Sequence, residues 1–551
     1  MMQISGSFLT LILLWITQGT PVTHPSDQSP APLEADLVVY DATPAGISAA
    51  IAGRRAGLEV ILISPHEHLG GLTTSGLGAT DVGAGSTVGG IGREFYQALR
   101  EHYDSPQSWS RQKKSDFKGR GHKDGEDVAW TFEPHIAEAT IESMLKKEGV
   151  RVLRNSPIDR TAAATTRSIP WRLIGLRLKK GGMVRGKVFI DASYEGDLLP
   201  LAQVPYTVGR ESNDQYEETL NGVQNGRATK HQFKEEVSAR VDPQDPDSPW
   251  LPGLLTPPHA EDGTADRGVQ AYCFRMCLTD DPENQIPWKK PADYDASQYE
   301  LLLRQYDQGS TFTPWHIVHM PNRKSDVNNN GAVSTDFIGG NIGYVEGSDE
   351  DRARIYEAHR SWQQGLIWTL AHHPRVPEKV RKSVNRWQPA ADEFTDHDGW
   401  PWRLYVREGR RMVSKVVMNE NHVRAKVTVD DPVGLASYGM DSHNVHRRVI
   451  DGKVRNEGDI QVYGFEPWPI SYRAIVPPPQ TCSNLIVPVA ISASHIAFGS
   501  ARMEPVFFVL GESAGIAAAE AIRKGTAVQS LPYDELRPLL DKAGQRLQFQ
   551  R

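Results

Sequence analysis

The chain has 551 residues, of which 39% are hydrophobic and 23% are charged, and this is the composition of an ordinary globular protein. The length is sufficient for two or more domains or for one large α/β enzyme. A net charge of -7 and an isoelectric point near 6.2 argue against a nucleic-acid-binding protein, because such proteins usually present a basic face.

The N-terminus has the pattern of a secretory signal. The apolar run from Phe8 to Ile16 is too short to span a bilayer comfortably, and polar, proline-rich sequence follows it as far as Glu34. We therefore predict a signal peptide over residues 1–20, a leader or linker over residues 21–35, and no stable membrane span. The protein is expected to be secreted or periplasmic. No twin-arginine signal is present, so any cofactor is expected to bind after export.

The first regular unit is "LVVYDATPAGISAAIAGRRAGLEVILIS", residues 37–64, which predicts a strand, a tight turn, a helix and a second strand. The turn falls where dinucleotide-binding chains carry G-x-G-x-x-G, but here the three positions are Asp41, Thr43 and Gly46. Asp tolerates the left-handed conformation of the turn, Thr43 is a natural helix cap, and Pro44 suits the first helical position.

The second strand of this unit ends at Ser64, where dinucleotide-binding chains usually place an acidic residue that holds a ribose. Glu67 is close by and is a possible substitute. Judged locally, two interpretations stay open. One is a nucleotide site with substituted glycines, and the other is an ordinary β-α-β unit that binds nothing.

Further elements of a nucleotide fold are predicted at both ends of the chain. A glycine-rich stretch over residues 68–95 precedes an amphipathic helix over 133–149, which a short strand follows. Another strand is predicted over 187–193, and near the C-terminus a strand over 484–492 leads to a helix over 506–522. The two ends therefore resemble halves of one doubly wound domain.

The middle of the chain differs in composition. Residues 210–470 contain many Pro, Trp and charged residues and no repeated β-α unit. The predicted fold class is α/β: a Rossmann-like, nucleotide-binding type of domain assembled from residues 36–209 and 471–546, with an inserted α+β substrate domain over 210–470. The two parts would meet in a cleft, where ligands usually bind.

The three cysteines, Cys273, Cys277 and Cys482, are too few for a disulfide framework. We expect them to be buried structural thiols. No Cys/His spacing is typical of a zinc site, and the sequence predicts no metal.

Several segments that occur in order carry a resemblance to a known family. "HLGGLTTSGLG" follows the second strand, "DASYEGD" follows an internal strand, and "SASHIAFGSARMEPVFFVLGESAGIAAA" lies near the end. With "VNNNGAVSTDFIGGN" and "DEFTDHDGWPWRLYVREGRRM", they resemble the FAD-dependent oxidoreductases of the glutathione-reductase-like flavoprotein class. The resemblance is to a bacterial, often exported subgroup that is sometimes described as xanthan lyase, and it extends from about residue 36 to 546.

This resemblance implies FAD as the cofactor and assigns residues to it. The turn would hold the pyrophosphate, Ser64 would lie by the adenosine ribose, and the backbone of Val152 would contact the adenine. The last helix would point its N-terminus at the flavin, where its dipole favours negative charge. The implied cofactor-binding residues are Asp41, Ala42, Thr43, Pro44, Ala45, Gly46, Ser64, Gly70, Gly71, Val152, Asp191, Ala192, Gly196, Arg502, Glu504, Pro505 and Gly511.

Candidate catalytic residues lie in the insertion and before the last helix. His495 is expected to take a proton from the substrate, although it could instead hydrogen-bond a loop backbone. Arg407 and Arg411 are candidates for holding a carboxylate or for a structural ion-pair network, and Arg473 is a similar candidate. We reject a hydrolase triad made of the adjacent residues 441–443, because neighbours in sequence cannot converge on one substrate.

These residues predict an FAD-dependent oxidoreductase that moves a hydride between flavin N5 and a small polar substrate, such as a sugar or a hydroxy or carboxylic acid. Its partners would be this substrate and an unidentified electron acceptor. Two alternatives stay open: a fumarate-reductase-like carbon–carbon bond reductase, and a polysaccharide lyase or binding protein on a degenerate nucleotide fold.

Overall fold

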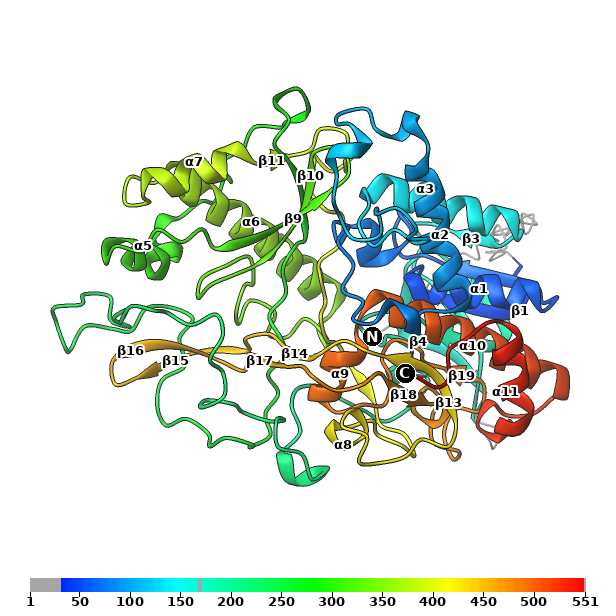
Figure 1. The fold of residues 1–551 in the computed structure, drawn as a ribbon. Helices are drawn as coiled ribbons and strands as arrows, with labels where there is room; N and C mark the ends of the chain where they lie inside the picture. The colour runs from blue at the N-terminus through cyan, green and yellow to red at the C-terminus, as the bar shows by residue number, and fades with distance from the viewer. Residues whose placement is uncertain (1–30, 167–170, 550–551) are drawn as a thin grey trace, which may run out of the picture.

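A seven-stranded sheet forms the centre of the computed structural model, which describes residues 31–166 and 171–549 (Figure 1). The parallel strands have the order β3 (Arg151–Leu153), β2 (Val60–Ile63), β1 (Leu33–Tyr40), β6 (Met183–Asp191) and β19 (Leu485–Ile486). Because β19 pairs with β6, both ends of the chain contribute to one Rossmann-like sheet. The predicted signal peptide and most of the predicted leader lie outside the described residues.

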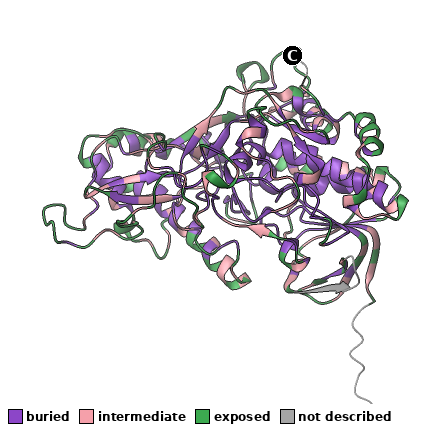
Figure 2. Ribbon diagram, turned by 90° about the horizontal axis from the view of Figure 1, so that it is seen from below, coloured by how far each residue is buried: buried purple, intermediate pink, exposed green. Residues whose placement is uncertain are grey.

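The central parts of the parallel strands, residues 37–40, 60–63 and 188–190, are apolar and buried because both faces of the sheet are covered there. Side chains alternate between the faces along β1, so Leu37 and Val39 belong to the core beneath the long helices. Val38 and Tyr40 belong to a second core, which Leu173 and Leu176 of β5 also enter. Figure 2 shows buried residues running through the middle of the molecule and exposed residues on its outer loops and helices.

Helices cover one face of the sheet: α1 (Pro44–Arg55), α2 (Gly90–Asp104), α3 (Pro134–Lys147), α10 (Glu504–Lys524) and α11 (Tyr533–Lys542). Helices α1 and α10 cross closely. Gly511 and Gly515 permit this, since a side chain at either position would collide with the backbone of α1. Among the described residues, α10 is the one helix whose length and composition would allow a membrane crossing, and 83% of its apolar window is buried inside the protein.

The other face is covered by the antiparallel strands β4 (Ile158–Thr166) and β5 (Arg172–Leu178), which join the sheet at the first residues of β6. The short helix α4 (Leu198–Leu201) follows β6 on the same side, and its Leu198 and Leu199 enter the second core. The glycine-rich stretch after β2 contains the 3-10 helix η1 (Gly71–Thr74).

A second sheet lies in the middle of the chain, with the antiparallel order β11 (Gln388–Pro389), β8 (Met276–Thr279), β10 (Lys324–Asn329) and β9 (Trp315–Met320). It lies beside α5 (Glu300–Asp307), α6 (Asp349–His372) and α7 (Glu378–Arg386), in the green region of Figure 1. Helix α6 begins with a capping box, in which Ser348 and Asp351 bind each other's backbone amides. Three acidic residues in its first turn interact favourably with the positive end of the helix dipole.

Short strand pairs make up the rest of the middle segment. They are β7 (Tyr206–Thr207) with β12 (Arg411–Met412), β13 (Pro432–Ala436) with β18 (Trp468–Ser471), β14 (Met440–Ser442) with β17 (Ile460–Val462), and β15 (His446–Ile450) with β16 (Lys453–Glu457). Two short helices, α8 (Glu420–Val423) and α9 (His495–Ala501), complete the described elements beside the 3-10 turns.

One expectation needs correction. The strand predicted over 484–492 is limited to Leu485–Ile486, because the residues after it turn toward α9. The segment predicted as an insertion contacts the C-terminal part of the chain, where Ser513 of α10 donates a hydrogen bond to the carbonyl of Val433 in β13. The boundaries at residues 210 and 470 stay predictions. The three cysteines are free and buried, as expected.

Candidate active site

The turn after β1 has the shape of a phosphate-binding turn in spite of its missing glycines. Asp41 adopts a φ of 74°, the left-handed conformation that a glycine usually supplies. Thr43 caps α1 by accepting a hydrogen bond from the amide of Gly46 at 3.4 Å, and its hydroxyl donates to the carbonyl of Ala192 at 2.8 Å. A side chain at Gly46 would collide with the carbonyl of Asp41, so only glycine fits there.

The amides at this turn support an anion site. Ala42, Thr43 and Ala45 are 2%, 0% and 0% exposed, and their N–H groups have no acceptor among the described residues. Buried amides without a partner are rare in folded proteins, and the N-terminus of a helix favours negative charge. A diphosphate would supply the missing acceptors, so these residues fit the cofactor that the sequence implies.

The charge of Asp41 is compensated by a residue from the middle of the chain. Arg403 donates to both carboxylate oxygens of Asp41, at 3.0 and 2.5 Å, and its guanidinium lies over the ring of Tyr194 at 4.6 Å. Both partners of the ion pair are buried. The carboxylate is therefore neutralised where it would otherwise repel a diphosphate.

A cavity of about 170 Å³ opens at the carboxyl ends of β1, β2 and β6, and we name it the sheet-edge cavity. It lies between β1 and β6, from which the sheet continues in opposite directions, and ligands of doubly wound folds bind at such points. Its lining residues are Tyr40, Asp41, Pro65, His66, Pro157, Ile158, Arg160, Ser193, Glu195, Asp197, Tyr344, Asp349, Arg352 and Arg403.

Two residues expected at the adenosine do not line this cavity. The hydroxyl of Ser64 donates to the carbonyl of His66 at 2.8 Å and so stabilises its own turn. Val152 pairs with Leu62 inside the sheet. Pro65, His66 and Pro157 are the cavity-lining residues nearest to them in sequence. The expected roles of Ser64 and Val152 stay predictions.

The glycine-rich stretch passes beside the turn. Gly70 and Gly71 have φ values of 106° and 59°, and the amide of Gly70 donates to the carbonyl of Ala42 at 2.7 Å. The hydroxyl of Tyr194 accepts from the amide of Leu72 at 3.0 Å. These contacts place η1 against both the turn after β1 and the loop after β6.

The loop after β6 is folded by a buried carboxylate. Asp191 accepts hydrogen bonds from the hydroxyl and amide of Ser193 and from the amide of Leu198. Burial raises the pKa of Asp191 to about 7, although these hydrogen bonds oppose the rise. Gly196 has a φ of 66°, which suits glycine, and so the loop returns toward the turn as expected from the sequence.

The N-terminus of α10 approaches the same region. Its first residue, Glu504, accepts from the hydroxyl of Tyr194 at 2.8 Å and from the hydroxyl of Thr73 at 3.0 Å. Burial raises the pKa of Glu504 to about 7. Pro505 follows at a position that suits proline, and Gly511 allows α10 to lie against Ala45 of α1.

A second, narrow space, without room for a water molecule, lies beside the start of α10, and we name it the inner cavity. It brings together three residues that the sequence singled out, Arg407, Arg502 and Glu504. The complete lining is Tyr194, Tyr405, Val406, Arg407, Val489, Phe498, Arg502, Glu504 and Phe507. Tyr194 and Glu504 connect this space with the loops around the sheet-edge cavity.

The two arginines of the inner cavity differ in how their charge is balanced. Arg407 donates to the carboxylate of Asp336 at 2.7 Å, and Asp336 also binds His443 at 2.7 Å. Arg502 donates to the hydroxyl of Tyr405 at 2.9 Å and to the carbonyl of Asp441 at 3.1 Å. The nearest carboxylate oxygen to Arg502 is 3.9 Å away, and its buried Nε has no partner among the described residues.

His495 lies behind this cavity in a buried network. Its Nδ1 is 2.7 Å from the carboxylate of Glu408, and its Nε2 is 2.8 Å from the hydroxyl of Ser442. Although burial alone would raise it, His495 and Arg411 hold the pKa of Glu408 below its ordinary value. Glu408 is therefore ionised and accepts from Nδ1, and in the neutral tautomer that carries its proton on Nδ1, Nε2 can accept from Ser442.

Arg411 and Arg473 do not reach either cavity. Arg411 is fully buried between the carboxylates of Glu211 and Glu408, at 2.7 and 2.8 Å, in the ion-pair arrangement that the sequence left open. The side chain of Arg473 is 40% exposed and pairs with Asp431 at 2.8 Å. The structure thus separates Arg473 from the other candidates.

Sequence reasoning missed Arg403, Glu408, Tyr405 and Ser442. The adjacent residues 441–443 indeed form no triad, since Ser442 binds His495 while His443 binds Asp336. Ser442 nevertheless belongs to a Ser–His–Glu arrangement built from three distant segments. A signal was present, because "LYVREGRRM" contains Glu408 among its arginines.

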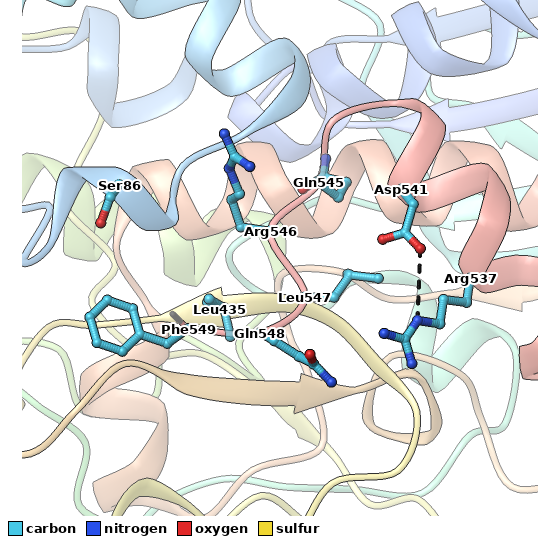
Figure 3. A pocket seen from close by; sticks show the side chains of 9 residues that line it. All are labelled: Ser86, Leu435, Arg537, Asp541, Gln545, Arg546, Leu547, Gln548 and Phe549. Atoms are coloured by element: carbon cyan, nitrogen blue, oxygen red, sulfur yellow. Dashed lines mark ion pairs between the residues drawn. The ribbon is translucent and has the colours of Figure 1, made fainter. Parts of the chain in front are cut away.

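A surface pocket of about 390 Å³ lies apart from these residues, against the C-terminal segment (Figure 3). Arg537 and Asp541 of α11 form a long ion pair of 3.7 Å at its edge. None of the residues that the sequence singled out lines this pocket. We assign no role to it.

The model of the family described as "FAD dependent oxidoreductase" matches residues 36–540. No curated protein matches the chain.

Solved structures show distant similarity. The chain is 11% identical to a geranylgeranyl bacteriochlorophyll reductase-like protein from Thermoplasma acidophilum, with 94% of this chain and 85% of that one covered and a TM-score of 0.37. It is 17% identical to a 3-ketosteroid-delta4-(5alpha)-dehydrogenase from Rhodococcus jostii, covering 33% and 50% at a TM-score of 0.19. It is 16% identical to a flavin monooxygenase variant from Stenotrophomonas maltophilia, with 29% of this chain and 38% of that one covered and a TM-score of 0.19. The chain thus spans half or less of the last two proteins.

Proposed function

This chain belongs to the FAD dependent oxidoreductase family and is an enzyme whose cofactor is FAD, and we propose that it oxidises a small, negatively charged hydroxy compound such as a hydroxy acid. The observation that carries this proposal is the buried guanidinium of Arg502 in the inner cavity. Its charge has no close carboxylate partner, and its Nε has no hydrogen-bond partner among the described residues.

We propose that the cofactor extends between the two cavities. The adenosine end would occupy the sheet-edge cavity, the free amides of Ala42, Thr43 and Ala45 would hold the diphosphate, and the flavin end would face the inner cavity. Bound FAD supplies the acceptor for a hydride from the substrate carbon. The two-part cofactor domain with an inserted substrate region is part of this proposal.

Arg502 would bind the substrate carboxylate. A guanidinium forms paired hydrogen bonds with a carboxylate, and such bonds are strong where water is excluded. Arg407 is less suited to this role, because Asp336 already neutralises it. It would instead fix Tyr405, whose ring lies 4.3 Å from the Arg407 guanidinium. A neutral sugar would leave Arg502 unpaired, and so a hydroxy acid is favoured over a sugar.

Removal of the hydroxyl proton would use Ser442 and His495. The carbonyl of Asp441 accepts from Arg502, so Ser442 follows directly after a residue that contacts the carboxylate-binding group. The substrate proton would move to Ser442 Oγ as the Ser442 proton moves to His495 Nε2. The imidazolium that results would be stabilised by Glu408, which accepts from Nδ1.

Glu504 would adjust the charge at the N-terminus of α10. Because its pKa is raised to about 7, the side chain is partly protonated at neutral pH. A neutral Glu504 does not oppose the negative charge that a helix N-terminus stabilises during flavin reduction. The electrons of the reduced flavin would then pass to a separate acceptor. We also propose that the protein is exported to the periplasm or the cell exterior.

Reduction of a carbon–carbon double bond is the second candidate, because Arg502 would also bind the carboxylate of an unsaturated acid. The Ser442–His495–Glu408 network favours alcohol oxidation, since it is suited to accept a hydroxyl proton. Family membership removes the basis of the lyase or binding-protein alternative, which rested on the missing glycines.

The test is anaerobic reduction of the bound flavin. The purified holoenzyme is mixed with hydroxy acids, neutral sugars and, after chemical reduction, unsaturated acids, while flavin absorbance is followed. Bleaching by one or more hydroxy acids is expected. Bleaching by sugars alone, or turnover of unsaturated acids alone, would overturn the proposal.

A further inference from the structure

Two clusters of ionisable side chains lie where the segment 392–398 contacts the N-terminal half of the chain, outside the proposed active site. One contains Glu133, His135 and Glu393, and the other contains His68, Asp396 and His397. In each, the possible ligand atoms of the three residues lie within 4.8 Å of one another. The first cluster shows how a cation is accommodated at this contact, and the second contains neither Lys nor Arg.

Lys324 provides the cation of the first cluster. Its fully buried ammonium lies 2.9 Å from Glu133, 2.9 Å from Asp392 and 2.6 Å from Glu393. His135 also binds Glu393, at 2.7 Å. A charge inside the protein is stable only when it is compensated, and here a side chain of the second sheet compensates three carboxylates. No metal is needed in this cluster.

The second cluster has carboxylates but no comparable side-chain cation. Asp396 pairs only with His68 and His397, and Glu138 pairs only with His68, among the described residues. No Lys or Arg of the described chain lies within ion-pair distance of these two carboxylates. The cluster therefore offers two imidazoles and one carboxylate as ligands, with a second carboxylate behind one imidazole.

The geometry resembles that of a metal site with an oriented histidine. His68 Nε2 lies 2.9 Å from Asp396 Oδ2, and His397 Nδ1 lies 2.9 Å from Asp396 Oδ1. The opposite nitrogen of His68, Nδ1, lies 3.0 Å from Glu138. Metal-binding histidines usually donate their second nitrogen to a carboxylate in this manner. His397 Nδ1 is buried, and its contact with Asp396 lacks hydrogen-bond geometry among the described residues.

We propose that His68 Nε2, Asp396 and His397 Nδ1 bind a divalent transition-metal ion, for which Zn²⁺ is the best fit, with Glu138 as a positioning residue. Two nitrogens and one oxygen are typical ligands of Zn²⁺, and water would complete a tetrahedral site. Hard cations such as Ca²⁺ prefer six or more oxygens and would not be held.

The position of the ion indicates a structural role. His68 is the first residue of the glycine-rich stretch, whereas Asp396 and His397 come from a segment about 328 positions further along the chain. Trp402 stacks on His68 at 5.5 Å, and the next residue, Arg403, neutralises Asp41. A metal would thus fasten the middle segment to the loop beside the phosphate-binding turn. The sequence predicted no metal, since no Cys/His spacing is typical of a zinc site; only the fold brings His68 and His397 together.

The alternative is a protonated His68 that simply bridges Glu138 and Asp396. Metal binding distinguishes the two, because a proton bridge needs neither His397 nor Zn²⁺. The holoenzyme, freed of metal on a chelating resin, is dialysed against Zn²⁺ or Ca²⁺ and the bound metal is measured by elemental analysis. The variants are His397→Asn, Asp396→Asn and Glu138→Gln, with Asp398→Asn as the matched control. Asp398 is exposed and lies 3.9 Å from Lys289.

We expect one Zn²⁺ per chain in the wild type and in Asp398→Asn, and no bound Ca²⁺. His397→Asn and Asp396→Asn should lose the tight site, and Glu138→Gln should weaken binding by roughly tenfold to a hundredfold. Flavin absorbance and the melting temperature report whether each variant is folded. Equal Zn²⁺ binding by all variants, equal binding of Ca²⁺, or no tight binding by the wild type would overturn the proposal.

Discussion

Asp41 shows at the scale of one residue how a phosphate-binding turn is retained without its first glycine. The residue adopts a φ of 74°, and its carboxylate is bound by Arg403, which lies 362 positions further along the chain. The sequence was sufficient to locate the turn, because Thr43, Pro44 and Gly46 each suit their position in it. It was insufficient to reveal the partner of Asp41, since nothing near Asp41 in sequence specifies Arg403.

The pair predicts a rescue between two substitutions. Arg403→Met leaves the buried Asp41 carboxylate uncompensated beside the diphosphate site, at a cost of roughly 3 kcal/mol or more. FAD affinity, measured by the recovery of flavin fluorescence on release, should fall by about a hundredfold. In Asp41→Gly/Arg403→Met, most of the affinity should return, because glycine adopts the same conformation without the charge. A double variant as weak as Arg403→Met would contradict this account.

The histidine network also belongs to this scale. Ser442→Ala removes the proposed proton carrier, and turnover should fall by roughly a hundredfold to ten-thousandfold while FAD stays bound. Glu408→Gln should lower turnover and change its dependence on pH, because the imidazolium of His495 would lose its carboxylate partner. The matched control is Ser513→Ala, which removes a buried hydroxyl that binds only the carbonyl of Val433. Equal losses in both serine variants would assign Ser442 a structural role.

At the scale of elements, the crossing of α1 and α10 determines where the proposed diphosphate and flavin positions lie relative to each other. Both helices begin near the proposed diphosphate and flavin positions, and Gly511 is the point of closest approach to Ala45. The periodic, apolar sequence of α10 made this helix predictable, and α3 and β6 were predictable for the same reason. The strand after residue 484 was predicted too long, because an apolar run without alternation does not distinguish strand from buried loop.

Gly511→Ala should therefore separate α10 from α1. The added methyl group would collide with the carbonyl of Ala45, whose amide belongs to the proposed diphosphate site. We expect weaker FAD binding together with a lower melting temperature, by several degrees. Gly226→Ala is the control, since its nearest neighbour is a side-chain oxygen 3.3 Å away. Unchanged FAD affinity in Gly511→Ala would argue against this placement of the diphosphate.

At the scale of the whole molecule, long-range contacts hold the two ends and the middle of the chain together. The shared sheet of β6 and β19 was predicted from the nucleotide-fold pattern at both ends. The middle segment was not predictable in detail, because its short strands pair across long loops and lack a regular period. Its contacts with the ends, through Arg403, Asp396 and Lys324, depend on residues that only the folded chain brings close.

Glu512 of α10 forms a pH-dependent contact between distant parts of the chain. It accepts from the amide of Ile91 in α2 and from the side-chain amide of Gln545, which follows α11, and burial raises its pKa to about 7 from 4.5. The folded state binds this proton more tightly than the unfolded state. Its stabilising effect is therefore complete below pH 4.5 and is lost as the pH rises through about 7.

Replacing Glu512 with Gln keeps the acceptor and removes the titration. Relative to the wild type, the free energy of unfolding of Glu512→Gln should rise by about 3 kcal/mol between pH 5 and pH 8. Chemical denaturation at both values measures the difference. Glu535→Gln, an exposed carboxylate on α11, is the control and should show little change. A constant difference between the two proteins would contradict the raised pKa.

The central claim is that Arg502 selects a negatively charged substrate. The most direct test compares kcat/KM for a hydroxy acid and for its neutral amide in the wild type and in Arg502→Met, with the flavin content of both proteins matched. We expect the wild type to prefer the acid by about a hundredfold or more, and Arg502→Met to lose this preference while it retains FAD. Equal use of acid and amide by the wild type, or an unchanged preference in Arg502→Met, would contradict this claim.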